Sequence, residues 1–594
     1  MSEIGASFRD VQGFLVDHVE YAFRALDSLL KGERPSYILL GGVVFVLILQ
    51  RCISFLTRSR RVWQDKGRHG KVKYLTLEKE ENIIIGGFTA GWKQVISSFV
   101  VDLPFIRSIV QAEKDKIVEK LRKDMKKQRQ GQQSQNIPSE FLTLPATGFS
   151  KNAVWKFAQE KQRMGYVIYR EGDSKASGAI YLGDKKLEDV LNQVYSQFSL
   201  SNPMHSDMFP SVRQMEAEVI QMTASLVGGG EHGAEPNVCG SMTSGGTESI
   251  LTAVKASRDY MMARHGIRAP EMIVGKSAHA AFVKAAEYFR IRLVKAPLDK
   301  KHRLTGKSVS RYINKNTVLV VASAPGFPHG ILDDVTGIGK ICEKKKIPLH
   351  VDACLGGFVL PFLRNLDLHT VPFDISFDFS VPGVTSMSLD THKFGCAHKG
   401  TSVVLFKSPE RRKYQYTSIT DWTGGLYISP GFAGSRSGAL ISTAWTALLY
   451  HGLDGYIRNA RRMMNCAEIL KHAVQNDIPE LEIVGDPVMC VVAFKSVTKD
   501  LNIYIVNDLM SDKGWHLNAL QDPQAVHMCF TPAHSENIAR ELARDLKDCV
   551  EQAKKKSPKD SDGLAPLYGM AAKVPDRRIV GDFLIAYQDI LLEP

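Results

Sequence analysis

The chain has 594 residues, of which 44% are hydrophobic and 23% are charged. This balance excludes an intrinsically disordered protein, and the length predicts two or more packed units. The net charge of +13 raises the possibility of a nucleic-acid interface. Much of the positive excess, however, lies just after residue 57 and in 111–135, and no zinc-finger, helix-turn-helix or RNP signature is present, so we predict no nucleic-acid partner. The nine cysteines are scattered without a C-x-x-C pair, which indicates a reducing compartment and predicts no metal site.

An apolar segment near the N-terminus is predicted to cross a membrane. Residues 37–49 carry no charge, and the apolar character continues to residue 56 with an interruption at Arg51. A bilayer span needs about 20 mainly apolar residues, and an arginine near its end can reach the headgroups. We therefore predict a single transmembrane helix over 37–56, with a buried core helix or an uncleaved signal sequence as the alternatives.

The charges that flank this segment predict its orientation. Seven Arg and Lys residues and one acidic residue lie between 58 and 73, whereas acidic residues outnumber basic ones before the segment. Because positive flanks stay in the cytosol, we expect a short lumenal N-terminus over 1–36 and everything after the span in the cytosol. A basic juxtamembrane and linker segment over 57–140 follows. Its stretch 111–135 is either a basic patch for an anionic membrane surface or a solvated helix.

After residue 138 strand-like apolar runs alternate with amphipathic helices. Residues 317–322, 347–351 and 401–406 are typical of strands, whereas 248–264 and 335–345 are typical of helices. This alternation predicts an α/β fold with a mostly parallel sheet covered by helices. In such sheets ligands bind beyond the carboxyl ends of the strands.

A glycine-rich turn, GSMTSGGTES, precedes the helical run that begins near residue 248. Two glycines, Gly245 and Gly246, stand between the hydroxyls of Ser244 and Thr247 at the start of that helix. Such a turn can aim backbone N–H groups at one point, where the helix N-terminus adds positive potential, and this arrangement holds phosphate groups. An ordinary capped helix start is the alternative, and a P-loop is excluded because no G-K-[ST] follows.

Three further residues complete a recognisable set in chain order. His279 precedes a helix of small residues and can stack on a flat ring. Asp352 ends a strand-like run and needs a partner, which can be a pyridinium N–H, a backbone N–H or an Arg. Lys393 lies in a polar turn beside His392 and can act as an activated amine. Each residue alone is ordinary, but together they predict a pyridoxal phosphate (PLP) site in which Lys393 carries the cofactor as a Schiff base.

The motifs of this chain resemble a known family. They read SGAIYLG, SNPMHSDMFPS, TSGGTESI, SAHAAF, HVDACLGGF, DTHKFGCAHKG, GSRSGAL and YGMAAKVPDRRIV. They resemble the fold-type-I PLP enzymes of the group II decarboxylase superfamily and, within it, the sphingosine-1-phosphate lyases. The resemblance spans roughly 144–579. It implies an N-terminal segment of the catalytic unit over 141–205, a large PLP-binding domain over 206–440 and a smaller C-terminal α+β domain over 441–594.

The resemblance also implies roles for individual residues. Lys393, Asp352 and His279 would be catalytic: the first joined to the cofactor, the second paired with its ring nitrogen, the third stacked on its ring. The further cofactor contacts would be Ser244, Gly245, Gly246, Thr247, Ala353 and His392, with Gly434, Ser435 and Arg436 contributed by a partner subunit. The substrate contacts would be Tyr181, Asn202, His205 and Lys399. Phe394 and Cys396 stand where many members have tyrosines, and His398 stands where proline is usual.

The implied activity is that of a carbon–carbon lyase of sphingolipid degradation, of the sphinganine-1-phosphate aldolase type. It would cleave the C2–C3 bond of phosphorylated sphingoid bases, sphingosine 1-phosphate and dihydrosphingosine 1-phosphate, to a long-chain aldehyde and phosphoethanolamine. The expected setting is a homodimer with shared active sites, held in the endoplasmic reticulum membrane by one span with the catalytic domain facing the cytosol. A PLP-dependent amino-acid decarboxylase of the same superfamily and a non-enzymatic scaffold are the alternatives.

Overall fold

A computed structural model of the chain describes residues 143–163, 174–230, 233–366, 375–498, 500–556 and 577–593, with seven separate positions between 111 and 123. The chain divides into two compact units, one formed by Val167–Lys555 and the other by Met1–Tyr166 with Lys556–Pro594. The predicted span over 37–56 and the segment before it lie outside the described residues. Of the helices within the described ranges, none has both the length and the hydropathy that a bilayer crossing requires.

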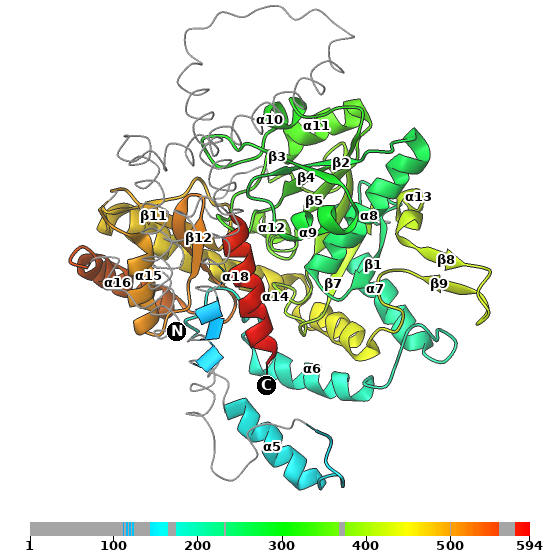
Figure 1. Ribbon diagram of the computed structural model, residues 1–594, viewed down its shortest axis with the longest axis horizontal. Helices are drawn as coiled ribbons and strands as arrows, with labels where there is room; N and C mark the ends of the chain where they lie inside the picture. The colour runs from blue at the N-terminus through cyan, green and yellow to red at the C-terminus, as the bar shows by residue number, and fades with distance from the viewer. Residues whose placement is uncertain are drawn as a thin grey trace, which may run out of the picture. The chain divides into compact units, whose positions relative to one another are not determined.

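The larger unit is built on a seven-stranded sheet (Figure 1). Its strands run in the order β1-β7-β6-β5-β4-β2-β3. They are β1 (Cys239–Thr243), β2 (Glu271–Gly275), β3 (Arg292–Ala296), β4 (Thr317–Ser323), β5 (Leu349–Asp352), β6 (Val384–Leu389) and β7 (Ser402–Phe406). All neighbours from β3 to β6 pair in parallel, whereas β7 runs antiparallel to β6 and to β1. The predicted mostly parallel sheet is therefore confirmed.

Helices cover this sheet, and every residue of β4, β5 and β6 is buried, as expected for strands covered on both faces. α8 contacts β4, β6 and β7, and α11 contacts β4, β5 and β6. Both predicted helices are confirmed. The helices of this part are α6 (Lys185–Gln197), α7 (Pro210–Leu226), α8 (Gly246–His265), α9 (Ala281–Tyr288), α10 (Gly306–Ser310), α11 (Val335–Lys345), α12 (Leu360–Leu363) and α13 (Pro409–Arg412).

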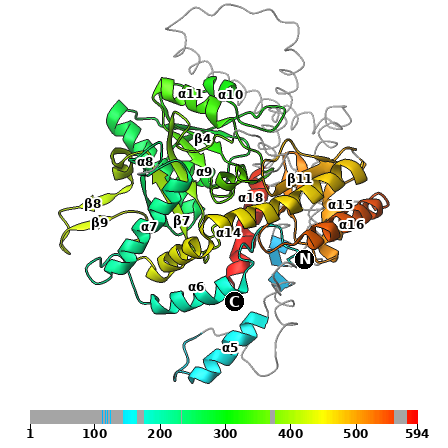
Figure 2. The ribbon, with the colours of Figure 1, turned by 180° about the vertical axis from the view of Figure 1, so that it is seen from behind.

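Helix α14 (Gly438–His472), which is kinked at Gly452, leads from this part of the unit to a second, smaller sheet (Figure 2). It contacts α6 and α7 as well as α16 and β11. The smaller sheet is antiparallel, in the order β10-β11-β13-β12. The strands of this sheet and the helices of the same region are β10 (Leu481–Ile483), β11 (Val491–Ser496), α15 (Ile503–Asp512), β12 (Asn518–Gln521), β13 (Gln524–Cys529) and α16 (Glu536–Ala553). The predicted domain boundaries at 205 and 440 stay predictions.

A hairpin of β8 (Thr417–Ile419) and β9 (Tyr427–Ser429) projects from the larger unit (Figure 1). Its side chains Trp422, Leu426 and Ile428 are exposed. In the other unit, the described helices are α5 (Lys151–Arg163) and α18 (Arg577–Leu592). Separate positions between 111 and 123 are helical as well.

The segment that carries Tyr181 is fixed to the smaller sheet through Ser177. The Ser177 hydroxyl accepts hydrogen bonds from the Cys529 N–H at 2.9 Å and from the Asn518 side-chain amide at 2.7 Å. It donates to the His527 carbonyl at 3.3 Å. A buried hydroxyl with three partners is fully satisfied, so these bonds hold the segment that leads to Tyr181 against the smaller sheet.

Candidate active site

Three strands of the large sheet bring the predicted site residues to one edge. β5 and β6 pair in parallel, and β1 runs in the same direction because β7 is antiparallel to both β6 and β1. The chain that leaves β1 enters the Gly245–Gly246 turn, β5 ends at Asp352, and β6 is followed by Asp390 and Lys393. The carboxyl ends of these strands therefore form one site, as the fold class predicts.

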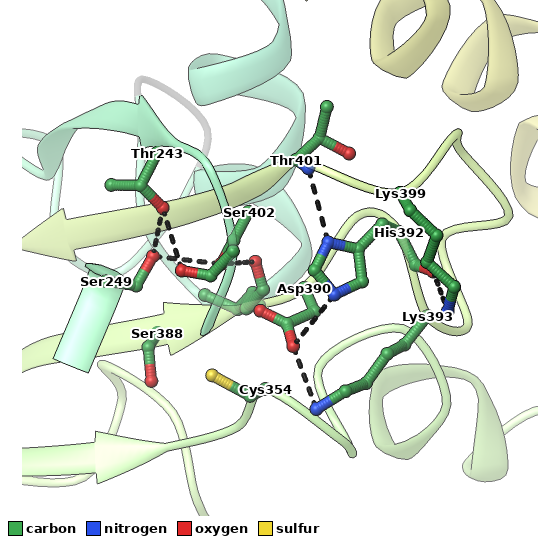
Figure 3. A network of polar contacts seen from close by, with 12 residues as sticks. Thr243, Ser249, Cys354, Ser388, Asp390, His392, Lys393, Lys399, Thr401 and Ser402 are labelled. Atoms are coloured by element: carbon green, nitrogen blue, oxygen red, sulfur yellow. Dashed lines mark hydrogen bonds and ion pairs between the residues drawn. The ribbon is translucent and has the colours of Figure 1, made fainter. Parts of the chain in front are cut away.

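The glycine turn forms the start of α8, and hydroxyls hold it in place. Thr243 Oγ1 lies 2.6 Å from Ser249 Oγ, which lies 2.9 Å from Ser402 Oγ (Figure 3). The first N–H groups of α8 have no intrahelical acceptor, as at any helix start, and among the described residues no side chain caps the helix at Gly245. A Cβ on Gly246 would stand 2.8 Å from both carboxylate oxygens of Asp390, which explains why only glycine fits there.

Lys393 faces a carboxylate that the sequence analysis did not single out. Its Nζ lies 2.8 Å from Oδ2 of Asp390, which is 2% exposed (Figure 3). Burial is the largest single effect on the pKa of Lys393 and lowers it. The charge of Asp390, the nearby Cys354, the hydrogen bond to Asp390 and the charge of Asp352 together outweigh burial and hold that pKa above its usual range. Oδ1 of Asp390 has no hydrogen-bond partner within the described part of the chain. An acidic residue three positions before the lysine, directly after an apolar strand, was the sequence signal that could have found it.

His392 is held as a neutral imidazole between this carboxylate and the next strand. Its Nδ1 accepts a hydrogen bond from the Thr401 N–H at 3.2 Å, which leaves the ring proton on Nε2, 3.6 Å from Asp390 Oδ2 (Figure 3). Burial lowers the pKa of His392, and the Asp390 charge offsets only part of that effect. Its Nε2–H is thus a donor close to the glycine turn, since a Cβ on Gly245 would lie 3.2 Å from His392 Cε1.

Two of the predicted substrate contacts lie beside this lysine loop. Lys399 Nζ donates to the His392 carbonyl at 3.3 Å and stands 4.4 Å from the centre of the Tyr181 ring. Tyr181 is buried and packs edge-on against Phe394, with ring centres 5.0 Å apart. Desolvation and then the positive charge of Lys393 lower the pKa of Lys399. The pair therefore places a cation and an aromatic ring beside the loop that carries Lys393.

Asp352 and His279 come from separate elements of the same edge. Asp352 is buried, and its Oδ1 accepts hydrogen bonds from the Cys354 N–H at 3.1 Å and from the Ser388 hydroxyl at 3.2 Å. The small residue Ala353 follows it and is also buried. His279 is exposed, and its Nδ1 accepts from the Ala281 N–H at 3.1 Å at the start of α9. Its stacking on a cofactor ring stays a prediction.

A second cluster gathers the other predicted residues. The Asn202 side-chain amide donates to Ser435 Oγ at 3.1 Å, and its Oδ1 accepts from the Arg436 N–H at 3.2 Å. The His205 N–H donates to the Asn202 carbonyl at 3.1 Å, and the Arg436 guanidinium pairs with Glu216 of α7. Within the described residues, the structure thus joins Asn202 and His205 to the loop that holds Gly434, Ser435 and Arg436, and brings Tyr181 and Lys399 to the lysine loop.

The lysine cluster fits PLP by the chemistry of its groups. It offers an amine for an aldehyde, a buried carboxylate for a ring N–H, and an uncapped helix N-terminus with a neutral His donor for a phosphate. Asp390 Oδ1 is buried and has no partner in the ranges that the structure describes, and a bound group could satisfy such an atom.

Comparison with known proteins agrees with this site. Residues 197–497 match the pyridoxal-dependent decarboxylase conserved domain. The chain is 44% identical over 506 residues to sphingosine-1-phosphate lyase of Arabidopsis thaliana, covering 84% of this chain and 89% of that protein. It is 42% identical over 450 residues to sphingosine-1-phosphate lyase 1 of Rattus norvegicus, covering 76% and 77%. A solved structure of sphingosine-1-phosphate lyase from Burkholderia pseudomallei matches with a TM-score of 0.69 at 35% identity, covering 76% of this chain and 98% of that one. The chain therefore belongs to the sphingosine-1-phosphate lyase family of PLP-dependent enzymes.

Proposed function

We propose that this protein is a PLP-dependent carbon–carbon lyase that cleaves phosphorylated sphingoid bases between C2 and C3. Its products are a long-chain aldehyde and phosphoethanolamine, as in sphingolipid degradation. The observation that carries the proposal is the placement of Lys393 against buried Asp390 at the strand edge that also holds Asp352 and the α8 N-terminus. The relatives that match most of the chain are lyases, so the amino-acid decarboxylase alternative is not favoured.

The residues that would hold PLP are those of the lysine cluster. Lys393 would bind its aldehyde, Asp352 its ring N–H, and Gly246, Thr247 and His392 its phosphate. When bound, PLP supplies an electron sink for the bond that breaks. Because Asp390 keeps the pKa of Lys393 high, an Nζ freed from the cofactor is well placed to take the proton of the substrate's C3 hydroxyl and to hold it.

Lys399 and Tyr181 are suited to the polar end of such a substrate. An ammonium group forms charge-assisted hydrogen bonds with a phosphate, and Lys399 lies close enough to contact the His392 carbonyl of the lysine loop. The buried Tyr181 ring beneath it limits where that ammonium can lie. Together they would fix the substrate's phosphate at a set distance from Lys393.

Replacing the reactive lysine tests the proposed reaction. Lys393→Ala should lower aldehyde release from sphingosine 1-phosphate by about a thousandfold or more, because within the described residues Lys393 is the lysine that pairs with Asp390. The matched control is Lys407→Ala, which removes a lysine paired with Glu235 outside the site and should keep the wild-type rate. A wild-type rate in Lys393→Ala would refute the proposal. Carbon dioxide release from an amino acid, without aldehyde from the lipid, would favour a decarboxylase.

Replacing the carboxylate that faces Lys393 tests the electrostatics. In Asp390→Asn the burial of Lys393 is no longer opposed by that charge, so the pKa of the lysine should fall. Since only a neutral amine attacks an aldehyde, covalent loading of the apoprotein with PLP should then extend to lower pH than in the wild type. Absorbance of the lysine–cofactor adduct across a pH series measures this. An unchanged profile, equal to that of the exposed control Asp486→Asn, would contradict the role given to Asp390.

We also propose a homodimer in which the 434–436 loop completes the site of the partner subunit. The predicted site residues fall into two clusters in one chain, one around Lys393 and one around Asn202 and Arg436. The projecting hairpin exposes Trp422, Leu426 and Ile428, and exposed apolar side chains of this kind are typical of a binding surface.

Mixing two inactive variants tests the shared site. Lys393→Ala and Arg436→Ala homodimers should each be inactive. After random exchange of subunits, each mixed dimer would hold one intact site, so activity should return to about a quarter of the wild-type value. If the loop served its own subunit, both sites of every mixed dimer would be defective. Mixed dimers that stay inactive, with subunit exchange verified by two different affinity tags, would therefore rule out the shared site.

We further propose that the span over 37–56 anchors the protein in the endoplasmic reticulum membrane with the catalytic unit in the cytosol. The uncharged run and the basic flank after it support this orientation, and a long-chain lipid substrate is concentrated in the bilayer. Protease added to sealed microsomes should digest the catalytic unit without detergent. A unit that becomes accessible only after detergent is added would show the opposite orientation.

A further inference from the structure

A chain of buried polar side chains lies behind Asp352. His350 is fully buried, with Nδ1 3.0 Å from Ser386 Oγ and Nε2 3.2 Å from Ser388 Oγ. Ser388 Oγ in turn donates to Asp352 Oδ1 at 3.2 Å. The arrangement follows from strand geometry: His350 and Asp352 are two residues apart on β5 and face the same side, and β6 pairs Ser386 and Ser388 with them.

The protons of this chain can be assigned from its partners. The single hydroxyl proton of Ser388 is donated to the Asp352 carboxylate, which can only accept when ionised. Ser388 Oγ must therefore accept from His350 Nε2–H. Burial lowers the pKa of His350 to about 4, so the ring is neutral and carries one proton, and its bare Nδ1 accepts from the Ser386 hydroxyl. All three hydrogen bonds then point toward Asp352.

Packing fixes the imidazole in this orientation. Phe282 of α9 lies against His350, with ring centres 6.0 Å apart and planes at 60°. Phe282 and His350 are both fully buried, so a 180° flip of the imidazole ring would require the surrounding side chains to move. The Cys354 N–H also donates to Oδ1, so two donors hold one oxygen of Asp352. Among the described residues no hydrogen bond to its other oxygen is found, so that oxygen is available to a ligand.

We propose that His350 and Ser388 are positioning residues for the lyase reaction, which orient Asp352 and favour its charged form toward the ring nitrogen of PLP. The inference rests on the proposed function, because it presumes that Asp352 pairs with that nitrogen. Both residues act through Asp352 and not on the substrate. Two donors on Oδ1 stabilise the carboxylate that in turn keeps the ring nitrogen protonated.

Ser388→Ala removes the donor with the least change in volume. The bound cofactor's visible absorption spectrum should change because its ring nitrogen is less protonated. The kcat should fall by about tenfold or more with little change in KM, since the lost interaction acts on the bond-breaking step. Ser388→Thr keeps the hydroxyl and should restore both the spectrum and kcat. His350→Phe, which removes the Nε2–H donor, should reproduce the effect of Ser388→Ala.

Ser386→Ala is the matched control. Ser386 lies on the same strand, is also buried and bonds the same imidazole. It is three hydrogen bonds from Asp352, whereas Ser388 bonds Asp352 directly. It should keep the wild-type spectrum and a kcat within about threefold of wild type.

Two results would overturn the inference while leaving the proposed function intact. One is Ser388→Ala with the wild-type spectrum and kcat. The other is a loss of apoprotein thermal stability in Ser388→Ala without any spectral change, which would show a merely structural role. A wild-type protein that binds no PLP would instead contradict the proposed function itself.

Discussion

A buried carboxylate and a lysine amine 2.8 Å apart, Asp390 and Lys393, are the pair on which the rest of the site depends. A charge at 2% exposure is costly unless it is paired, so the two side chains hold each other at the strand edge. The neighbours are arranged around them: Gly246 leaves room for the Asp390 oxygens, and His392 turns its Nε2–H toward the same carboxylate. Removing that charge would leave less to oppose the desolvation of the buried amine, and the pKa of Lys393 would fall.

The order of the strands explains how residues far apart in the chain reach this pair. β1, β5 and β6 end at one edge, so the glycine turn, Asp352 and the lysine loop meet there although about 150 residues separate the first from the last. The residues predicted to bind a substrate come from two places. Tyr181 reaches the lysine loop because Ser177 anchors its segment, whereas Asn202 holds the Ser435–Arg436 loop. This division is the observation behind the proposed site shared between two subunits.

The sequence predicted the parts of the site that follow strands and helix starts. Asp352 and Lys393 were found because strand ends and polar turns have local patterns, and the α11 range was predicted because its periodicity is clear. β5 begins two residues later than expected, because Pro348 lacks the N–H that a strand interior would donate. Asp390 was missed because an acidic residue after a strand is common, and only three-dimensional contact shows its partner. His350 and Ser388 were missed for a similar reason. Their pairing depends on the register of β5 against β6, which local pattern does not encode.

The covalent link between Lys393 and the cofactor is the central claim, and one measurement tests it directly. The purified protein is reduced with borohydride, digested, and its peptides are mapped by mass spectrometry for a pyridoxyl group. The account predicts a single label, on Lys393. A label on another lysine, or none, would contradict it.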